Sequence, residues 1–409
     1  MNDAENLTKL LGHLPPAVFR EFMVDQFGLA MPDLDTKKPK KEQREPMEAV
    51  LSALGVSERQ RIEEVAERIV LLSDGAGQDV IDGFKDDIFD DAAREAFAAI
   101  PNQYHRALWL HIHEPAIFEE ALSARQADVF RQSASCYSGF IAPANLAVLD
   151  DAAAKTAFHQ TVAQQLGCSD DAVAIQIFKR LRPDTQTGEE VDLYQISIHH
   201  NRPPEIIDCV QASELVPQEV IRAVSSHITY EPANGHLEVL SKDTAGREAL
   251  ARIVADSLLQ SPITGEKIPL KQYDYQSLAA PRNFDIADEP VAFVKVVELG
   301  YSAANGRSLL VRIWTKDADD IYTAAKSLIS STFDFRDHHL NYAKLSIKVK
   351  KVDKDRARTI TVILRDDNKC NIKTKREKDR ALCDRLLAEW HLVKEIGHVV
   401  EVPADAVAA

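Results

Sequence analysis

A pair of histidines is the most enzyme-like feature of the sequence. His111 and His113 are two residues apart, and Glu114 follows directly. On a strand, residues two apart share a face, so both imidazoles and the carboxylate could bind one metal ion. Such a site would indicate a metal-dependent hydrolase or nuclease. The alternative is a helix–helix junction, because residues 104–110 have a helical pattern and Pro115 is typical of a helix start.

Two further clusters contain residue types that could take part in phosphate chemistry. Asp337-His338-His339 has the letters of a phosphoesterase motif, but no other acidic motif of such enzymes is recognisable. Asp367-Asn368-Lys369 combines acid and lysine as in some metal-dependent nucleases. In those sites the two residues alternate on a strand, whereas here turn residues surround them. We therefore predict no catalytic residues, and metal binding by His111, His113 and Glu114 remains an alternative only.

Residues 69–77 resemble a strand that enters a glycine-rich cofactor loop. However, Ile62 and the apolar residues after it recur at spacings of three and four, which is the helical period. We expect a helix that starts near Ser57 and ends at Gly75. The sequence therefore predicts no bound cofactor.

The segment from Ala343 to Arg380 is basic within an acidic chain. It contains 14 Lys and Arg against 6 Asp and Glu, a balance of +8. The whole chain carries −15, so the remainder carries −23. Apolar and polar residues alternate over residues 344–350, which predicts a strand. Residues 359–365 are rich in β-branched side chains, which predicts a second strand. A helix with capping-box spacing from Thr374 should follow, with Arg376 and Arg380 largely in solvent.

Lysines in a row along a strand could bind the phosphates of nucleic acid or another polyanion by counterion release. Few aromatic residues lie in this segment, which disfavours base stacking. The alternatives are a lysine-guarded edge strand and a contact for an acidic protein. The candidate binding residues for DNA or RNA are Lys344, Lys348, Lys350, Lys351, Arg356, Arg358, Lys373, Lys375, Arg376 and Arg380.

An acidic cluster in the first third of the chain could bind a basic protein partner. Several of its carboxylates are three or four residues apart and would share one side of a helix. A divalent-metal site and a simple solvated face are the alternatives. The members are Asp79, Asp82, Asp86, Asp87, Asp90 and Asp91.

Hydrophobic periodicity divides the chain into two predicted domains. Residues 1–185 should be helical, with an exposed linker near 31–45 and helices over residues 115–165. Residues 186–409 should form antiparallel sheets with helices, giving an α+β fold overall. Hairpin-then-helix units are expected near residues 228, 291 and 344. The turn signals are Asn234-Gly235 and Asn305-Gly306, and the candidate caps are Asp243 or Thr244, Asp317 or Asp319, and Thr374.

Composition narrows the functional class without fixing a reaction. The chain has 409 residues, 45% hydrophobic and 28% charged, as in ordinary globular proteins. Its five cysteines are scattered and the start of the chain is acidic, so we expect a cytoplasmic protein without a membrane span. Our interpretation is a non-catalytic binding protein with basic segment 343–391. A metal-dependent enzyme and a structural subunit of a multi-protein complex are the alternatives.

Overall fold

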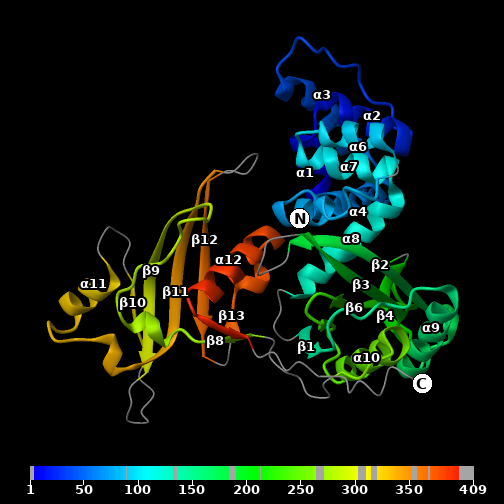
Figure 1. Ribbon diagram of the computed structural model, residues 1–409. Helices are drawn as coiled ribbons and strands as arrows, with labels where there is room; N and C mark the ends of the chain where they lie inside the picture. The colour runs from blue at the N-terminus through cyan, green and yellow to red at the C-terminus, as the bar shows by residue number, and fades with distance from the viewer. Residues whose placement is uncertain are drawn as a thin grey trace. The chain divides into compact units, whose positions relative to one another are not determined.

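The computed structural model describes residues 4–88, 90–131, 136–183, 190–211, 213–263, 271–302, 310–314, 320–351, 357–366 and 369–395 (Figure 1). Helices dominate the N-terminal part and antiparallel sheets the C-terminal part, so the predicted α+β class is confirmed. Contacts divide the chain into two units. Met1–Asp128 and Arg180–Arg182 form the first, and Val129–Lys179 and Pro183–Ala409 form the second. The first unit therefore ends earlier than residue 185, where the sequence placed the boundary.

The first unit is a helical layer whose apolar positions recur at three- and four-residue spacing. Leu7, Leu10, Phe19, Ile62 and Ile69 are among its buried residues. Its helices are α1 (Glu5–His13), α2 (Pro16–Phe27), α3 (Lys40–Ala53), α4 (Val56–Leu72), α5 (Gly75–Asp82), α6 (Asp91–Ala98), α7 (Gln103–His113) and most of α8 (Pro115–Arg131).

Two local predictions in this unit are wrong. Residues 40–45 belong to α3 and not to a linker, because Pro39 directly precedes the first helical turn and the helix buries Met47 and Leu51. Gly75 begins α5 and does not end α4. The Asp74 carboxylate accepts a hydrogen bond of 2.7 Å from the backbone N of Gly77, and this cap starts the new helix.

A five-stranded antiparallel sheet in the second unit has the order β1-β7-β6-β3-β2. Helices α9 (Ala152–Leu166) and α10 (Gly246–Val254) pack on one face, where Ile196, Ile228 and Val239 are buried. The strands are β1 (Tyr137–Ile141), β2 (Val173–Pro183), β3 (Glu190–Asn201), β6 (Ala223–Glu231) and β7 (His236–Leu240). Strands β1 and β2 lie inside residues 1–185, which were predicted to be helical, so that prediction is wrong for both. The five residues of β1 are too few to show a period, and they take their conformation from pairing with β7.

The opposite face of this sheet is polar and buried. Gln195, Ser197, His227 and Thr229 have at most 2% of their surface exposed. The Ser197 hydroxyl and Nδ1 of His227 are 2.9 Å apart. Burial, together with the charges of His199 and Arg131, lowers the pKa of His227 from 6.5 to about 3.

The buried His227 should make the protein sensitive to acid. Below pH 6.5 the unfolded chain takes up a proton at His227, whereas the folded chain does not until about pH 3. Stability is therefore lost as pH falls from 6.5, by about 2 kcal/mol at pH 5. Urea unfolding at pH 7 and pH 5 measures this loss. The variant His227→Gln, which stays neutral, should lose about 2 kcal/mol less than the wild type, and an identical loss would contradict this assignment.

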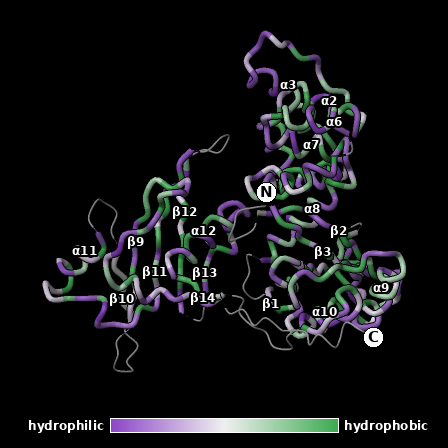
Figure 2. Tube along the Cα trace, viewed as in Figure 1, coloured by the Kyte–Doolittle hydropathy of each residue, from purple (hydrophilic) through white to green (hydrophobic). Residues whose placement is uncertain are grey.

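The second sheet of this unit has the order β10-β9-β11-β12-β13, and α12 (Glu377–Glu389) packs on one face. Its strands are β9 (Val291–Ser302), β10 (Leu310–Trp314), β11 (His339–Val349), β12 (Arg358–Arg365) and β13 (Lys369–Cys370). The two predicted strands of the basic segment are thus confirmed. Leu345 pairs with Val362 and Ile347 with Ile360, and these residues form the core beneath α12. Figure 2 shows hydrophobic and hydrophilic stretches along the same strands.

The predicted hairpin-then-helix units occur near residues 228, 291 and 344, and the second ends in α11 (Ile321–Leu328). Gly235 has φ of +71°, and a Cβ there would lie 2.0 Å from the carbonyl oxygen of Ala142, so the turn requires glycine.

Asn305-Gly306, Asp317 and Asp319 lie outside the described residues, and Asp320 caps α11. The caps predicted for α10 and α12 are wrong, because Ala245 and Arg376 occupy those positions without a capping side chain.

Two smaller strand pairs and several short helical turns complete the unit. Strand β8 (Lys271–Tyr273) pairs with β14 (Val393–Glu395), and β4 (Glu205–Gln211) pairs with β5 (Glu214–Val220). Short helical turns are η2 (Asp170–Ala172), η3 (Ala255–Leu259), η4 (Gln276–Ala279), η5 (Phe335–Asp337) and η6 (Ile372–Thr374). No helix of the described ranges is both long and apolar enough to cross a membrane.

Candidate nucleic-acid interface

The face of the second sheet opposite α12 carries most of its exposed polar side chains. Residues directly opposite each other in antiparallel strands share a face. Lys348 pairs with Phe293 and with Thr359, and Ser346 pairs with Lys295 and with Thr361. We name this surface the basic face, and it comprises Phe293, Lys295, Lys344, Ser346, Lys348, Thr359 and Thr361.

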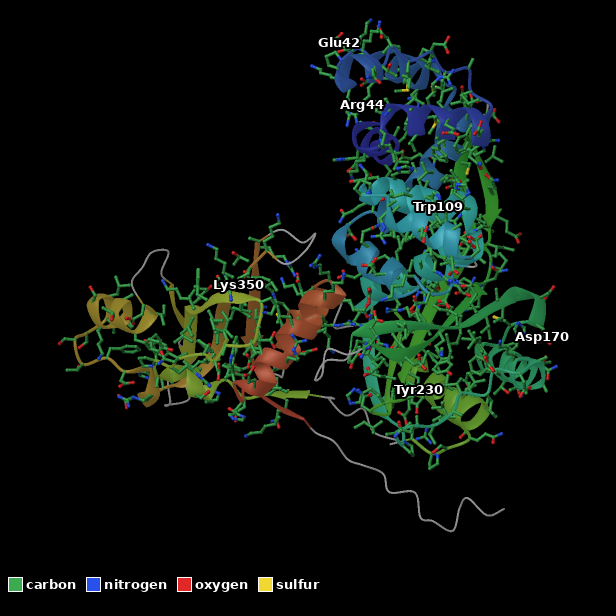
Figure 3. The ribbon with its side chains drawn as sticks, turned by 45° about the horizontal axis from the view of Figure 1, so that its top comes forward. Glu42, Arg44, Trp109, Asp170, Tyr230 and Lys350 are labelled. Carbon is green, nitrogen blue, oxygen red and sulfur yellow. The ribbon has the colours of Figure 1, made fainter. Side chains whose placement is uncertain are left out.

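A lysine and an aromatic ring meet at one end of the basic face. The Phe293 side chain is 48% exposed, and Nζ of Lys348 lies 5.5 Å from its ring centroid. Lys348, Lys350 and Lys351 are exposed, and the last two follow the end of β11. Lys350 is labelled in Figure 3. Lys344 is half-buried, and its Nζ lies 3.6 Å from the carboxylate of Glu298. The free positive charge is therefore concentrated at the C-terminal end of β11.

Three predicted binding residues instead pair with acids of α12, and one of them, Arg358 on β12, links this helix to the sheet. Arg358 and Arg376 both contact the carboxylate of Asp379, Arg358 through Nε at 2.9 Å and Arg376 through Nε at 3.3 Å. Arg380 is only 9% exposed, and its Nη2 lies 3.3 Å from the Glu377 carboxylate. The prediction that Arg376 and Arg380 lie largely in solvent is thus wrong, because acids in the first turn of α12 pair with them.

The remaining candidates have varied surroundings. Nζ of Lys373 lies 3.2 Å from the ring centroid of Tyr137, and burial lowers the lysine pKa from 10.5 to about 8. Lys375 is half-buried. Arg356 lies outside the described residues. Among the ten predicted residues, those that the structure shows as exposed are Lys348, Lys350 and Lys351.

Phe293 is the component of this surface that the sequence analysis missed. It lies on β9, some fifty residues before the basic segment, and reaches Lys348 through strand pairing. The sequence did contain an indication of this, because Phe293 and Lys295 are two residues apart in the predicted strand from Val291 and therefore share a face. Pairing of β9 with β11 could not be read from the periodicity of either strand.

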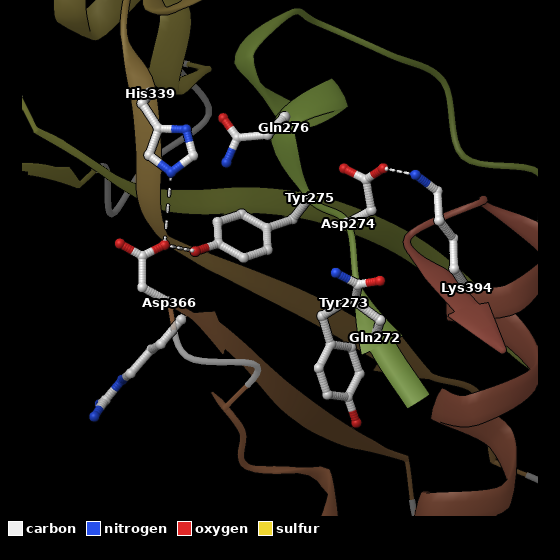
Figure 4. Close-up of a pocket in the computed structure, with 9 residues that line it drawn as sticks. Gln272, Tyr273, Asp274, Tyr275, Gln276, His339, Asp366 and Lys394 are labelled. Carbon is white, nitrogen blue, oxygen red and sulfur yellow. Dashed lines mark hydrogen bonds and ion pairs between the residues drawn. The ribbon is translucent and has the colours of Figure 1, made fainter. Parts of the chain in front are cut away.

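A polar pocket of about 320 Å³ lies at the other end of the same sheet (Figure 4). The Tyr275 hydroxyl donates a hydrogen bond of 2.9 Å to Oδ1 of Asp366, and Nε2 of His339 lies 3.8 Å from the same oxygen. Asp274 pairs with Lys394 at 2.7 Å. The pocket is lined by Gln272, Tyr273, Asp274, Tyr275, Gln276, His339, Arg365, Asp366 and Lys394.

One of the pocket's side chains supports the backbone of the sheet. The Gln276 amide bonds both the backbone N and the backbone O of Leu340, at 2.9 and 2.7 Å, and so fixes the start of β11. Only His339 of the Asp337-His338-His339 string lines the pocket. His338 stacks instead on Tyr301, with ring centroids 4.5 Å apart. The three residues therefore do not converge as a phosphoesterase motif would require.

The histidine pair lies on a helix and not on a strand. His111 and His113 belong to α7, where two residues turn the side-chain direction by about 200°. The His111 ring contacts Phe118 with centroids 4.8 Å apart, and the His113 ring contacts Trp109 at 4.7 Å. The shared face required for a metal site with Glu114 is thus absent. Within the described ranges, no group of three or more His, Cys, Asp or Glu could hold a metal ion.

The acidic cluster is partly used within the first unit. Asp82 pairs with Arg106 at 2.8 Å, Asp90 caps α6, and Asp79 is buried. Asp86, Asp87, Asp90 and Asp91 remain exposed, and Asp91 pairs with Arg94. The cluster is therefore smaller as a docking surface than the sequence indicates.

The sequence matches no protein-family model and no curated protein.

Proposed function

We propose that the protein binds single-stranded nucleic acid through the basic face, without catalysing a reaction. The observation that carries this proposal is the exposed ring of Phe293 beside exposed Lys348 on one sheet face, with exposed Lys350 and Lys351 directly after the end of β11. Lysines bind backbone phosphates without reading sequence, and an exposed aromatic ring can stack on any base. An extended strand laid across β9 and β11 would meet both.

Single strands fit this surface better than duplexes. In a duplex the bases are stacked on one another, so Phe293 would have no base to contact. Lys348, Lys350 and Lys351 can make up to three phosphate contacts, which corresponds to a salt slope of about −2 for a single strand. The proposal therefore predicts moderate affinity that weakens steeply with salt.

Binding to labelled single-stranded RNA, single-stranded DNA and duplex DNA at two salt concentrations tests this function. We expect fluorescence anisotropy to show binding of single strands at low salt, with weaker binding of the duplex. No binding of any polymer at low salt would overturn the proposal.

Removing the aromatic ring should separate stacking from charge. Phe293→Ala leaves every lysine in place and deletes the base platform, so we expect about tenfold weaker binding of single strands. Duplex binding should not change. The control is Val56→Ala, which removes an apolar side chain that is 86% exposed in the first unit. Equal losses in both variants, or an unchanged affinity in Phe293→Ala, would contradict stacking.

A further inference from the structure

The hairpin of β4 and β5 exposes large apolar side chains. Ile206, Val210 and Leu215 are 76%, 73% and 70% exposed. In the register of the hairpin, Val210 lies opposite Leu215, and Ile206 shares their face. Soluble proteins rarely expose clustered apolar side chains without a binding role, and a two-stranded hairpin alone is marginally stable in water. This face therefore needs an explanation beyond the fold.

The two faces of the hairpin differ. Ile207, Cys209, Val216 and Val220 occupy the other face and are half-buried. The hairpin thus has one face in partial contact with its own chain and one face turned to solvent. Strands β4 and β5 pair only with each other among the described strands, so a partner can also reach their outer edges.

Acidic residues are set among the exposed apolar side chains. Asp208 lies opposite Pro217, and Glu219 lies opposite Ile206, so both carboxylates project on the apolar face. Glu205 and Glu214 lie nearby on the other face and are also exposed. A partner that covered this face would bring Asp208 and Glu219 out of water, and it would have to supply positive charges.

We propose that this face docks a protein partner whose contact surface alternates apolar residues with lysine or arginine. The charge pattern excludes a second copy of the same face, because a symmetric pair would bury like charges against each other. On the exposed face of β4, Ile206, Asp208 and Val210 alternate between apolar and acidic at every second residue, which matches a partner face that alternates valine or leucine with lysine or arginine in the same way. This inference is independent of nucleic-acid binding by the basic face.

The probe for this surface is a nine-residue synthetic peptide in which every second residue is alternately valine and lysine, with threonine between them, so that one face of the extended peptide carries both residue types. We expect saturable binding of the labelled peptide to the full-length protein by fluorescence anisotropy. Val210→Ser with Leu215→Ser should weaken it about 100-fold, on the order of tenfold for each buried side chain. Asp208→Asn with Glu219→Gln should weaken it at low salt and remove most of its salt dependence.

Matched controls separate this face from the general acidity of the chain. Val56→Ser removes another exposed apolar residue, and Asp25→Asn with Asp288→Asn changes the same charge at exposed sites elsewhere. Peptide affinity should not change in the controls, and circular dichroism should show that all variants fold. Absent or non-saturable binding would overturn the proposal, as would equal losses in hairpin and control variants. Self-association of the protein that Leu215→Ser abolishes in sedimentation would also overturn it.

Discussion

Reversing the charge of Lys348, Lys350 and Lys351 together to glutamate should weaken binding of single-stranded nucleic acid about 100-fold near 0.1 M salt. Each phosphate contact contributes about 0.7 to the salt slope, so three contacts are worth about two orders of magnitude in affinity. All three side chains are exposed, and the fold should therefore tolerate the change. Fluorescence anisotropy over a range of salt concentrations measures both the affinity and the slope.

The matched control changes the same net charge elsewhere. Lys37, Lys38 and Lys41 are exposed at the start of α3 or just before it, within the segment 31–45 that was predicted to be an exposed linker. Reversing these three should leave the slope unchanged. If the control lost as much affinity as the variant at the end of β11, binding would depend on net charge and not on the basic face.

Replacing Asp379 with alanine should lower the free energy of unfolding by about 3 kcal/mol. The carboxylate of Asp379 contacts Arg358 and Arg376 at once, and its side chain is 11% exposed. Removing one partner from a largely buried charge network costs far more than removing an exposed ion pair. Urea unfolding monitored by the fluorescence of Trp390, which is buried on α12's side of the sheet, measures the change.

Two comparisons make this prediction specific. Asp33→Ala removes a fully exposed partner of Arg20 and should leave the urea midpoint unchanged. Nucleic-acid affinity of folded Asp379→Ala protein should not fall, because Arg358 lies on the face that α12 covers. If Asp379→Ala were as stable as the wild type, the ion pairs of Arg358 and Arg376 with Asp379 would not stabilise the fold. Assigning these two arginines to structure and the exposed lysines to binding would then be incorrect.

The division of the basic segment into two faces was only partly readable from the sequence. A period of two identified the strands and placed Leu345 and Ile347 on the core side and Lys348 on the other. The same rule places Arg358 with Ile360 on the core side, since Arg358 pairs with Val349. The net charge of the segment does not show which face of the sheet each basic side chain lies on, so the charge count alone did not separate Arg358 from Lys348.

Ion pairs between different helices and strands could not be predicted from the sequence alone. Asp379 is 21 residues from Arg358, and its position in the first turn of α12 became meaningful only once that helix packed on β12. Phe293 entered the basic face in the same way, through a neighbouring strand. Strand β1 was missed because its five residues take their conformation from pairing with β7 and not from a local period.

The histidine pair shows how one misassigned element changes the chemistry. Two histidines two residues apart share a face only on a strand, and α7 places them on different sides, against Phe118 and Trp109. The helical pattern of residues 104–110 was the better guide, since it extends through His113.

Photo-crosslinking of the full-length protein to a uridine-rich RNA, followed by mass spectrometry of the modified peptides, identifies the residues that contact nucleic acid. Ultraviolet light joins bases to the aromatic and lysine side chains that they contact, so the adducts report the surface itself. The account predicts adducts at Phe293 and in the segment from Lys344 to Lys351, reduced by high salt and by Phe293→Ala. Adducts confined to the lysine run at residues 37–41, or no adducts at low salt, would contradict it.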